Sequence, residues 1–264
     1  MIFIAGQLRA AINRLFPTRK HRIVLLGLVM VAAAIAVSEL VVAKIFIEIV
    51  LQEQQFSRAQ LIIITIAFFI FFGITRAGHY LQKIYRLDVF EKTLKIANKE
   101  SFKGLRKGSK YKKEHWTWSL AIELTNILSL GMRLVVVSFL FVFFSPVFVV
   151  INLIVTLIIF EKLSRIYRKQ LIVQRKFIVA SEKKEPVTNA RKVKTRVRSG
   201  EVATLYSNLG MMALLAVLLY LGYRGEIEPA NAIVLFLGLR LQNGSLSAIS
   251  VALMRFARAQ ANIE

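Results

Sequence analysis

The chain of 264 residues contains no cysteine, which excludes disulfides, thiol catalysis and zinc–thiolate sites. Histidine is scarce as well: His21, His79 and His115 are far apart and lack the spacing of a metal site. Acidic residues number 15 against 37 lysines and arginines, so the formal net charge is +22. No serine lies in a nucleophile-elbow sequence. The sequence therefore offers no catalytic constellation.

Nucleotide-binding motifs are also missing. No segment matches the phosphate-cradling pattern G-x-x-x-x-G-K-[ST], and no Ser-Gly-Gly signature occurs. We therefore expect the chain itself to be no enzyme and no ATPase, with no cofactor and no metal of its own.

Long apolar segments are what the chain has in abundance. It is 56% hydrophobic, with a mean hydropathy of +0.58, which is too apolar for an ordinary soluble domain. Six segments are long enough to cross about 30 Å of hydrocarbon as helices. The sequence predicts an all-α membrane protein with one six-helix transmembrane domain, residues 23–264. The expected spans are residues 23–51, 59–80, 119–144, 146–164, 204–223 and 229–254.

An N-terminal basic segment, residues 1–22, precedes that domain and has apolar positions at helical spacing. It is interpreted as an amphipathic helix lying on the anionic cytoplasmic leaflet. A solvated basic tail is the alternative.

The cations alternate along the chain. Every second interval between apolar segments is rich in lysine and arginine, and the intervals between those carry almost none. By the positive-inside tendency, both termini are expected in the cytoplasm, most simply of a bacterial plasma (inner) membrane. Because the cations lie between membrane-length segments, we expect lipid and protein partners and no nucleic acid.

Two long basic connectors, about residues 76–115 and 161–201, keep a helical spacing of apolar residues. Gly104 and Gly108 indicate a turn in the first connector, and Pro186 indicates a reversal in the second. The membrane helices are therefore expected to continue as long cytoplasmic extensions.

Charged residues inside the apolar segments are candidates for function. Arg133 and Arg240 lie about half way along their segments, where a cation is costly and normally faces protein or water. Three interpretations are open: a cavity for an anionic or polar group, pairing with carboxylates such as Glu39 or those of another chain, and snorkelling to the lipid interface. The candidate substrate-pathway residues are Arg133, Arg240, Gln242, Asn243 and Ser247.

Two segments resemble a known family. SLAIELTNILSLGMRL, which contains Glu123, is similar to the entry into the third helix of the transmembrane domain of ATP-binding-cassette (ABC) exporters of the six-helix type. RGEIEPANAIVLFLGLRLQNGSLSAISVALMRFARAQANIE is similar to their sixth helix. The resemblance implies that helices two to five extend into the cytoplasm and that two intracellular loops dock on nucleotide-binding domains. It also implies a dimer that encloses a translocation cavity.

The missing phosphate loop departs from most members of that family. The resemblance then implies either a separate ATPase subunit that binds ATP and Mg²⁺ or a fused ATPase domain of a longer protein, of which this sequence is only the neighbouring piece. It also implies a second copy or a similar transmembrane chain as partner. The residues implied for ATPase docking lie at the two loop tips: Lys103, Arg106, Lys107, Tyr111, Lys183, Lys184, Glu185 and Lys192.

Two other functional classes remain. One is a non-transporting membrane scaffold or immunity-type protein whose basic loops bind a cytosolic partner or anionic lipid. The other is an ion-driven secondary transporter, although the six segments lack the Gly/Pro-broken helices typical of that class. A scaffold has no need of a cation such as Arg240 at the bilayer midplane.

Overall fold

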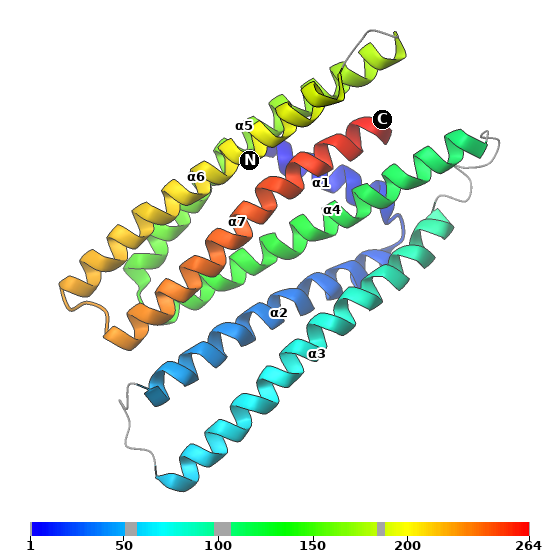
Figure 1. Cartoon of the computed structure of the whole chain (residues 1–264). Coiled ribbons are helices and arrows are strands. Elements are labelled where there is room, and N and C mark those ends of the chain that lie inside the picture. Colours follow the sequence, from blue (N-terminus) through cyan, green and yellow to red (C-terminus); the bar gives the residue numbers. More distant parts are fainter. Residues whose placement is uncertain (1, 51–56, 98–106, 184–187, 264) are drawn as a thin grey trace.

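The computed structural model describes residues 2–50, 57–97, 107–183 and 188–263 (Figure 1). Over these residues the chain is helical and contains no strand. The helices are α1 Ile2–Leu15, α2 Arg19–Val50, α3 Arg58–Ala97, α4 Lys107–Leu140, α5 Pro146–Glu182, α6 Asn189–Tyr223 and α7 Pro229–Ile263, with a 3-10 turn at Phe141–Phe143.

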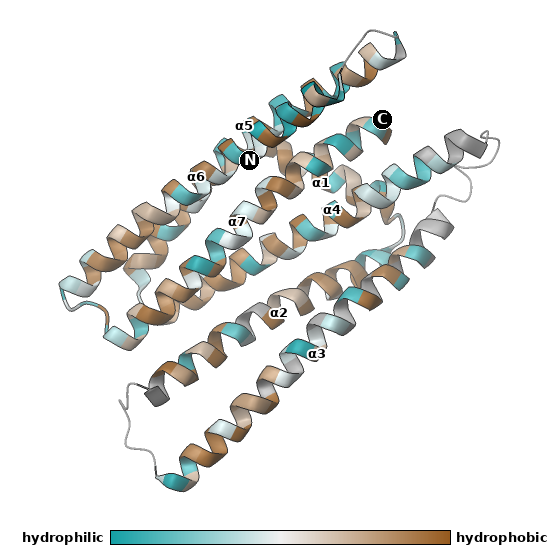
Figure 2. Cartoon of the chain, in the orientation of Figure 1, coloured by the Kyte–Doolittle hydropathy of each residue, from teal (hydrophilic) through white to brown (hydrophobic). Residues whose placement is uncertain are grey.

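All of these helices except α1 are long and apolar enough to cross a membrane. The prediction of an all-α protein with six membrane-spanning helices is thereby confirmed, and the chain is an integral membrane protein by the length and composition of its helices. Figure 2 shows the hydrophobic residues concentrated in the lower-left half of the bundle and most of the hydrophilic ones in the helical extensions at the upper right.

The helices continue well beyond the apolar segments, as expected for the two connectors. Helix α5 runs to Glu182 and α6 begins at Asn189, about 15 residues outside the apolar segments, or roughly 20–25 Å of helix. Gly108, however, lies in the first turn of α4, so the turn predicted at this residue is wrong. Gly104 and Pro186 lie outside the described residues.

Local sequence explains where several helices begin and end. The Ser145 hydroxyl accepts a hydrogen bond from the Phe148 amide (3.3 Å), and Pro146 occupies the first turn of α5. Thr188 caps α6 in the same way. Gly225 has a φ of 72°, which lets the chain turn sharply between α6 and α7 at little steric cost.

Helix α7 lies between α4 on one side and the α5–α6 hairpin on the other, while α2 and α3 continue the bundle beyond α4 (Figure 1). Gly238 of α7 faces the Phe141 ring so closely that a Cβ atom there would collide with it. Gly210 of α6 is equally close to Ile159 of α5. Small residues at such crossings let membrane helices approach closely.

The N-terminal segment forms α1, as the amphipathic interpretation predicts. Its buried side packs on protein: the Phe3 ring lies 6.1 Å from the Tyr167 ring of α5, measured between centroids. The Tyr167 hydroxyl donates to Gln260 of α7 (2.7 Å), and the Gln260 amide donates to Gln7 of α1. Contact of α1 with the anionic leaflet stays a prediction.

Candidate functional site

One face of α7 is the strongest candidate for a functional surface. Arg240, Gly244, Ala248, Val251 and Arg255 are separated by three or four residues, so they lie along one side of the helix. All five are exposed, although the opposite side of α7 is formed by buried residues along the length of the helix. This α7 face, as we call these five residues, therefore carries two arginines and has no covering helix in the described chain.

Arg240 lies about 11 residues after the start of α7, roughly 17 Å along the helix axis. In the part of the chain that the structure describes, its guanidinium makes no ion pair or hydrogen bond. The intrachain pairing that the sequence left open for Arg240 is thus not found among these residues.

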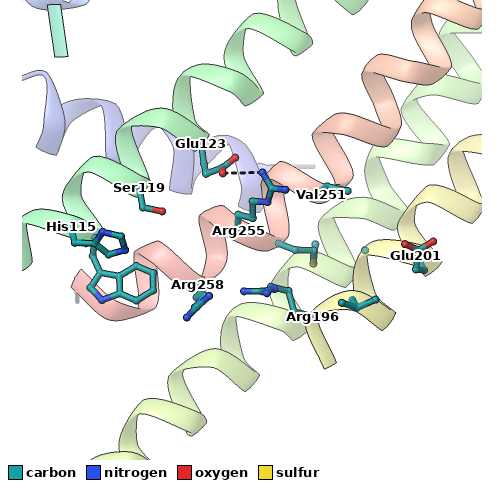
Figure 3. Close-up of a pocket in the computed structure, with 12 residues that line it drawn as sticks. His115, Ser119, Glu123, Arg196, Glu201, Val251, Arg255 and Arg258 are labelled. Atoms are coloured by element: carbon teal, nitrogen blue, oxygen red, sulfur yellow. Dashed lines mark ion pairs between the residues drawn. The ribbon is translucent and has the colours of Figure 1, made fainter. Parts of the chain in front are cut away.

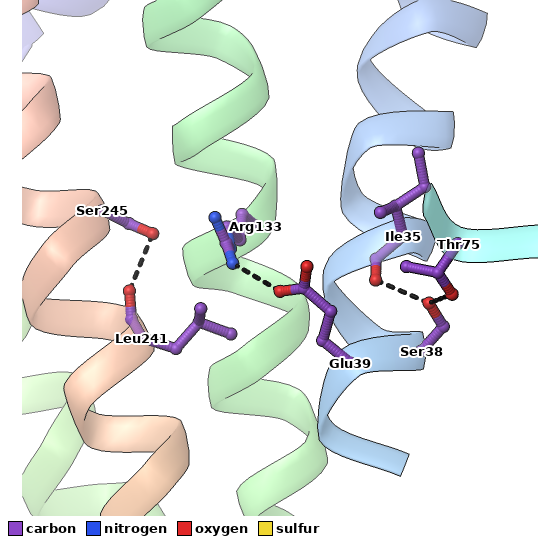
Figure 4. Close-up of polar contacts among 7 residues, drawn as sticks. All are labelled: Ile35, Ser38, Glu39, Thr75, Arg133, Leu241 and Ser245. Atoms are coloured by element: carbon purple, nitrogen blue, oxygen red, sulfur yellow. Dashed lines mark hydrogen bonds and ion pairs between the residues drawn. The ribbon is translucent and has the colours of Figure 1, made fainter. Parts of the chain in front are cut away.

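Arg133 has a different environment. Its guanidinium donates to the Glu39 carboxylate of α2 at 3.1 Å, and both side chains are largely covered (Figure 4). Of the three interpretations of Arg133, the structure therefore shows pairing with Glu39. This ion pair joins α4 to α2. Beside it, the hydroxyls of Ser38 and Thr75 are hydrogen-bonded at 2.9 Å and join α2 to α3.

Gln242 lies on the buried side of α7, with only 2% of its surface exposed. Its side-chain amide donates to the Asn152 carbonyl and to the Thr156 hydroxyl, each at 2.9 Å. Asn152 in turn donates to the Ser138 hydroxyl at 3.2 Å. This network ties α4, α5 and α7 together, so we remove Gln242 from the candidate surface and assign it a role in helix packing.

Asn243 and Ser247 flank the α7 face and are half-buried. The Asn243 amide donates to the Asn208 carbonyl of α6 at 3.0 Å, which links the two helices beside the exposed face. These two residues, together with Arg240, are the predicted pathway residues that the structure brings to one surface.

A cavity of about 470 Å³ opens at the end of the α7 face nearest the C-terminus, between α4, α6 and α7 (Figure 3). Arg255 reaches across it to the Glu123 carboxylate, 3.6 Å away. The Arg258 guanidinium lies 5.0 Å from the centroid of the Trp116 ring, within the range of a cation–π contact. Arg196 enters the cavity from α6.

Sequence reasoning singled out Glu123 but not this arginine cluster. Arg255 and Arg258, three residues apart at the end of an apolar helix, could have been noticed as a pair on one side. Nothing in the sequence indicates that Arg196, about 60 residues away, joins them.

The predicted ATPase-docking residues are only partly described. Lys103, Arg106, Lys184 and Glu185 lie outside the described residues, and Lys107 is the first residue of α4. Tyr111 and Lys183 are exposed, and Lys192 is half-buried in the first turn of α6. Lys183 caps the C-terminal end of α5.

Among the described residues, no group of three or more histidine, aspartate or glutamate side chains could hold a metal ion. The α7 face and the residues that flank it offer guanidinium, amide and hydroxyl groups to a ligand. No protein-family model matches the chain, and no curated protein matches it in sequence.

Proposed function

We propose that this chain is a transmembrane subunit of an ABC exporter and forms half of its substrate translocation pathway. A second copy, or a similar chain, faces α7 across the pathway. A separate ATPase subunit binds ATP and Mg²⁺ and docks on the two loop tips. The complex lies in a bacterial plasma membrane with both termini of this chain in the cytoplasm.

The exposed α7 face is the observation that carries the proposal. An arginine at the bilayer centre costs about 2.5–3.5 kcal/mol on insertion scales when it faces lipid. Arg240 therefore needs water or another chain beside it. Two copies of the α7 face enclosing water would satisfy this need and would create a polar path across the membrane.

The continuity of α6 supplies a way to couple the loop tips to that path. This helix runs unbroken through 35 residues, about 50 Å, from Asn189 to Tyr223. It touches α7 through the Asn208–Asn243 hydrogen bond and packs closely on α5 at Gly210. Movement of the α5–α6 tip by ATPase closure would therefore be carried to α7 by a stiff hairpin.

A membrane scaffold with basic docking loops would account equally well for the charged connectors. It would not account for Arg240 exposed at mid-span. A scaffold surrounded by lipid would have an apolar residue at this position, so the α7 face favours transport.

The energy source provides the direct test. The purified chain alone should hydrolyse no ATP, because it has no phosphate loop, and hydrolysis should appear when the ATPase subunit that co-purifies in mild detergent is added. Lys183→Glu and Lys192→Glu should reduce that assembly by about tenfold through charge repulsion and lost contacts. Lys169→Glu, an exposed site midway along α5, is the matched control and should assemble normally. Robust hydrolysis by the chain alone, or normal assembly of all three variants, would contradict the proposal.

Orientation can be measured because the natural chain has no cysteine. In Gln60→Cys and Glu226→Cys, the new thiols should react with a membrane-impermeant reagent added to intact cells. Ser181→Cys and Ala190→Cys should react only after the cells are opened. All four positions are exposed in the structure, so a difference reports the side of the membrane rather than burial.

A further inference from the structure

The cavity between α4, α6 and α7 concentrates positive charge. Arg196, Arg255 and Arg258 line it together with His115, while its carboxylates are Glu123 and Glu201. Because Arg255 is paired with Glu123, the charged groups that remain are the guanidiniums of Arg196 and Arg258 and the carboxylate of Glu201.

Arg196 and Arg258 project into the same space from α6 and α7 (Figure 3). Among the described residues, neither guanidinium has a carboxylate within ion-pair distance, and Glu201 lies apart from both at the far side of the cavity. Two neighbouring cations without an acid between them repel each other and gain from a shared anion. The Trp116 ring beneath Arg258 helps to hold that guanidinium in place.

We propose that this cavity binds the phosphate group of an anionic amphiphile. A guanidinium offers a planar fork of N–H donors that matches phosphate oxygens in pairs, and two such forks suit a group with two negative charges. The volume, about 470 Å³, is that of an ordinary small-molecule site.

The rest of the lining favours an amphiphile over free phosphate. Val197, Val251 and Met254 give the cavity an apolar wall beside the arginines. It lies where the apolar part of α7 ends, next to Trp116, an aromatic residue of the kind enriched at membrane interfaces. A lipid headgroup at this depth can place its phosphate on Arg196 and Arg258 while its chains follow the apolar wall.

That the amphiphile is transported, entering the α7 face from the inner leaflet, rests on the proposed transport function. That the cavity binds a phosphate group depends only on the residues that line it. The test is therefore made on the purified chain, without an ATPase.

Tryptophan fluorescence gives a local readout, because the chain has only two tryptophans and one of them, Trp116, lines the cavity. The detergent-solubilised chain is titrated with dioleoyl phosphatidic acid, dioleoyl phosphatidylcholine or inorganic phosphate. We expect saturable binding of phosphatidic acid, weakened about tenfold or more in Arg196→Gln and Arg258→Gln, as for the loss of one charge-assisted contact. Arg258→Lys keeps the positive charge but loses the planar fork of donors, so its affinity for phosphatidic acid should lie between those of the natural chain and Arg258→Gln.

Arg198→Gln is the matched control. Arg198 is exposed on the same helix as Arg196 and does not line the cavity, so this variant loses the same charge and should bind within about twofold of the natural chain. Gel filtration and circular dichroism establish that each variant is folded, and a variant that fails is replaced by its lysine counterpart.

If all three glutamine variants bound phosphatidic acid equally weakly, binding would depend on general surface charge and the proposed site would be refuted. Equal affinity of the natural chain for phosphatidylcholine would also refute it. Binding of inorganic phosphate with the same dependence on the variants would keep the phosphate site and overturn the lipid as its source. Failure to find an ATPase partner would count against the exporter proposal and would leave these binding results unchanged.

Discussion

Replacing Glu39 by alanine should lower the apparent melting temperature of the purified chain by roughly 5–10 °C. The Arg133 guanidinium donates to Glu39 at 3.1 Å, within the candidate membrane spans of α4 and α2. Without the carboxylate, Arg133 keeps its charge in an apolar region, which costs about 2.5–3.5 kcal/mol on insertion scales. The measurement is thermal unfolding in detergent, followed by circular dichroism.

A double-mutant cycle separates loss of the pair from loss of either residue alone. Arg133→Leu should also destabilise the chain, because it leaves the Glu39 carboxylate without its partner guanidinium. The double variant Glu39→Ala with Arg133→Leu should lose much less stability than the sum of the losses in Glu39→Ala and Arg133→Leu. Glu226→Ala is the control. The ion pair between Glu226 and Arg224 (3.5 Å) is exposed at a turn, so its loss should lower the free energy of unfolding by no more than about 1 kcal/mol. An unchanged melting temperature in Glu39→Ala would show that water or another chain, rather than Glu39, stabilises Arg133.

Helix number and helix length could be predicted from the sequence, because both follow from local patterns. The apolar segments have the length that a bilayer requires, and the connectors keep the spacing of a helix across the membrane boundary. Pro146 and Pro229 stand in the first turn of their helices, where a missing N–H costs nothing. The turn predicted at Gly108 was wrong because a glycine in the first turn of a helix is tolerated when the neighbouring residues favour helix.

The contacts between helices could not be predicted in the same way. Glu39 was one possible partner of Arg133 among several, and only the packing of α2 against α4 selects it. The hydrogen bond from Gln242 to Asn152 joins residues about 90 positions apart, and no periodicity reports such a pairing.

Gln242 could nevertheless have been separated from Arg240 on helical geometry alone. Two residues along an α-helix correspond to a rotation of about 200°, so the two side chains leave α7 on nearly opposite sides. The structure accordingly buries Gln242 in a network with α5 and exposes Arg240. The polar residues of α7 thus form two groups: one holds the bundle together, and the other is available to a ligand or a partner.

The thiol in Arg240→Cys should react with a membrane-impermeant, negatively charged methanethiosulfonate reagent in the assembled complex. Thiols react as thiolates, and an apolar environment suppresses the thiolate. If the α7 face lines water, the new thiols of Arg240→Cys and Ala248→Cys should react at least about tenfold faster than those at lipid-facing positions. This measurement needs no knowledge of the substrate.

Phe139→Cys and Leu219→Cys provide the comparison, since the side chains of Phe139 in α4 and Leu219 in α6 are strongly exposed, at 62% and 74%. Rates that are equally slow at Arg240 and Leu219 would place Arg240 against lipid or a tightly packed partner and would refute a water-filled pathway. Fast reaction at Arg240 that slows when ATP is added to the complex with its ATPase subunit would go further. It would indicate that the α7 face closes during the transport cycle, because access from water would then depend on the conformation of the dimer.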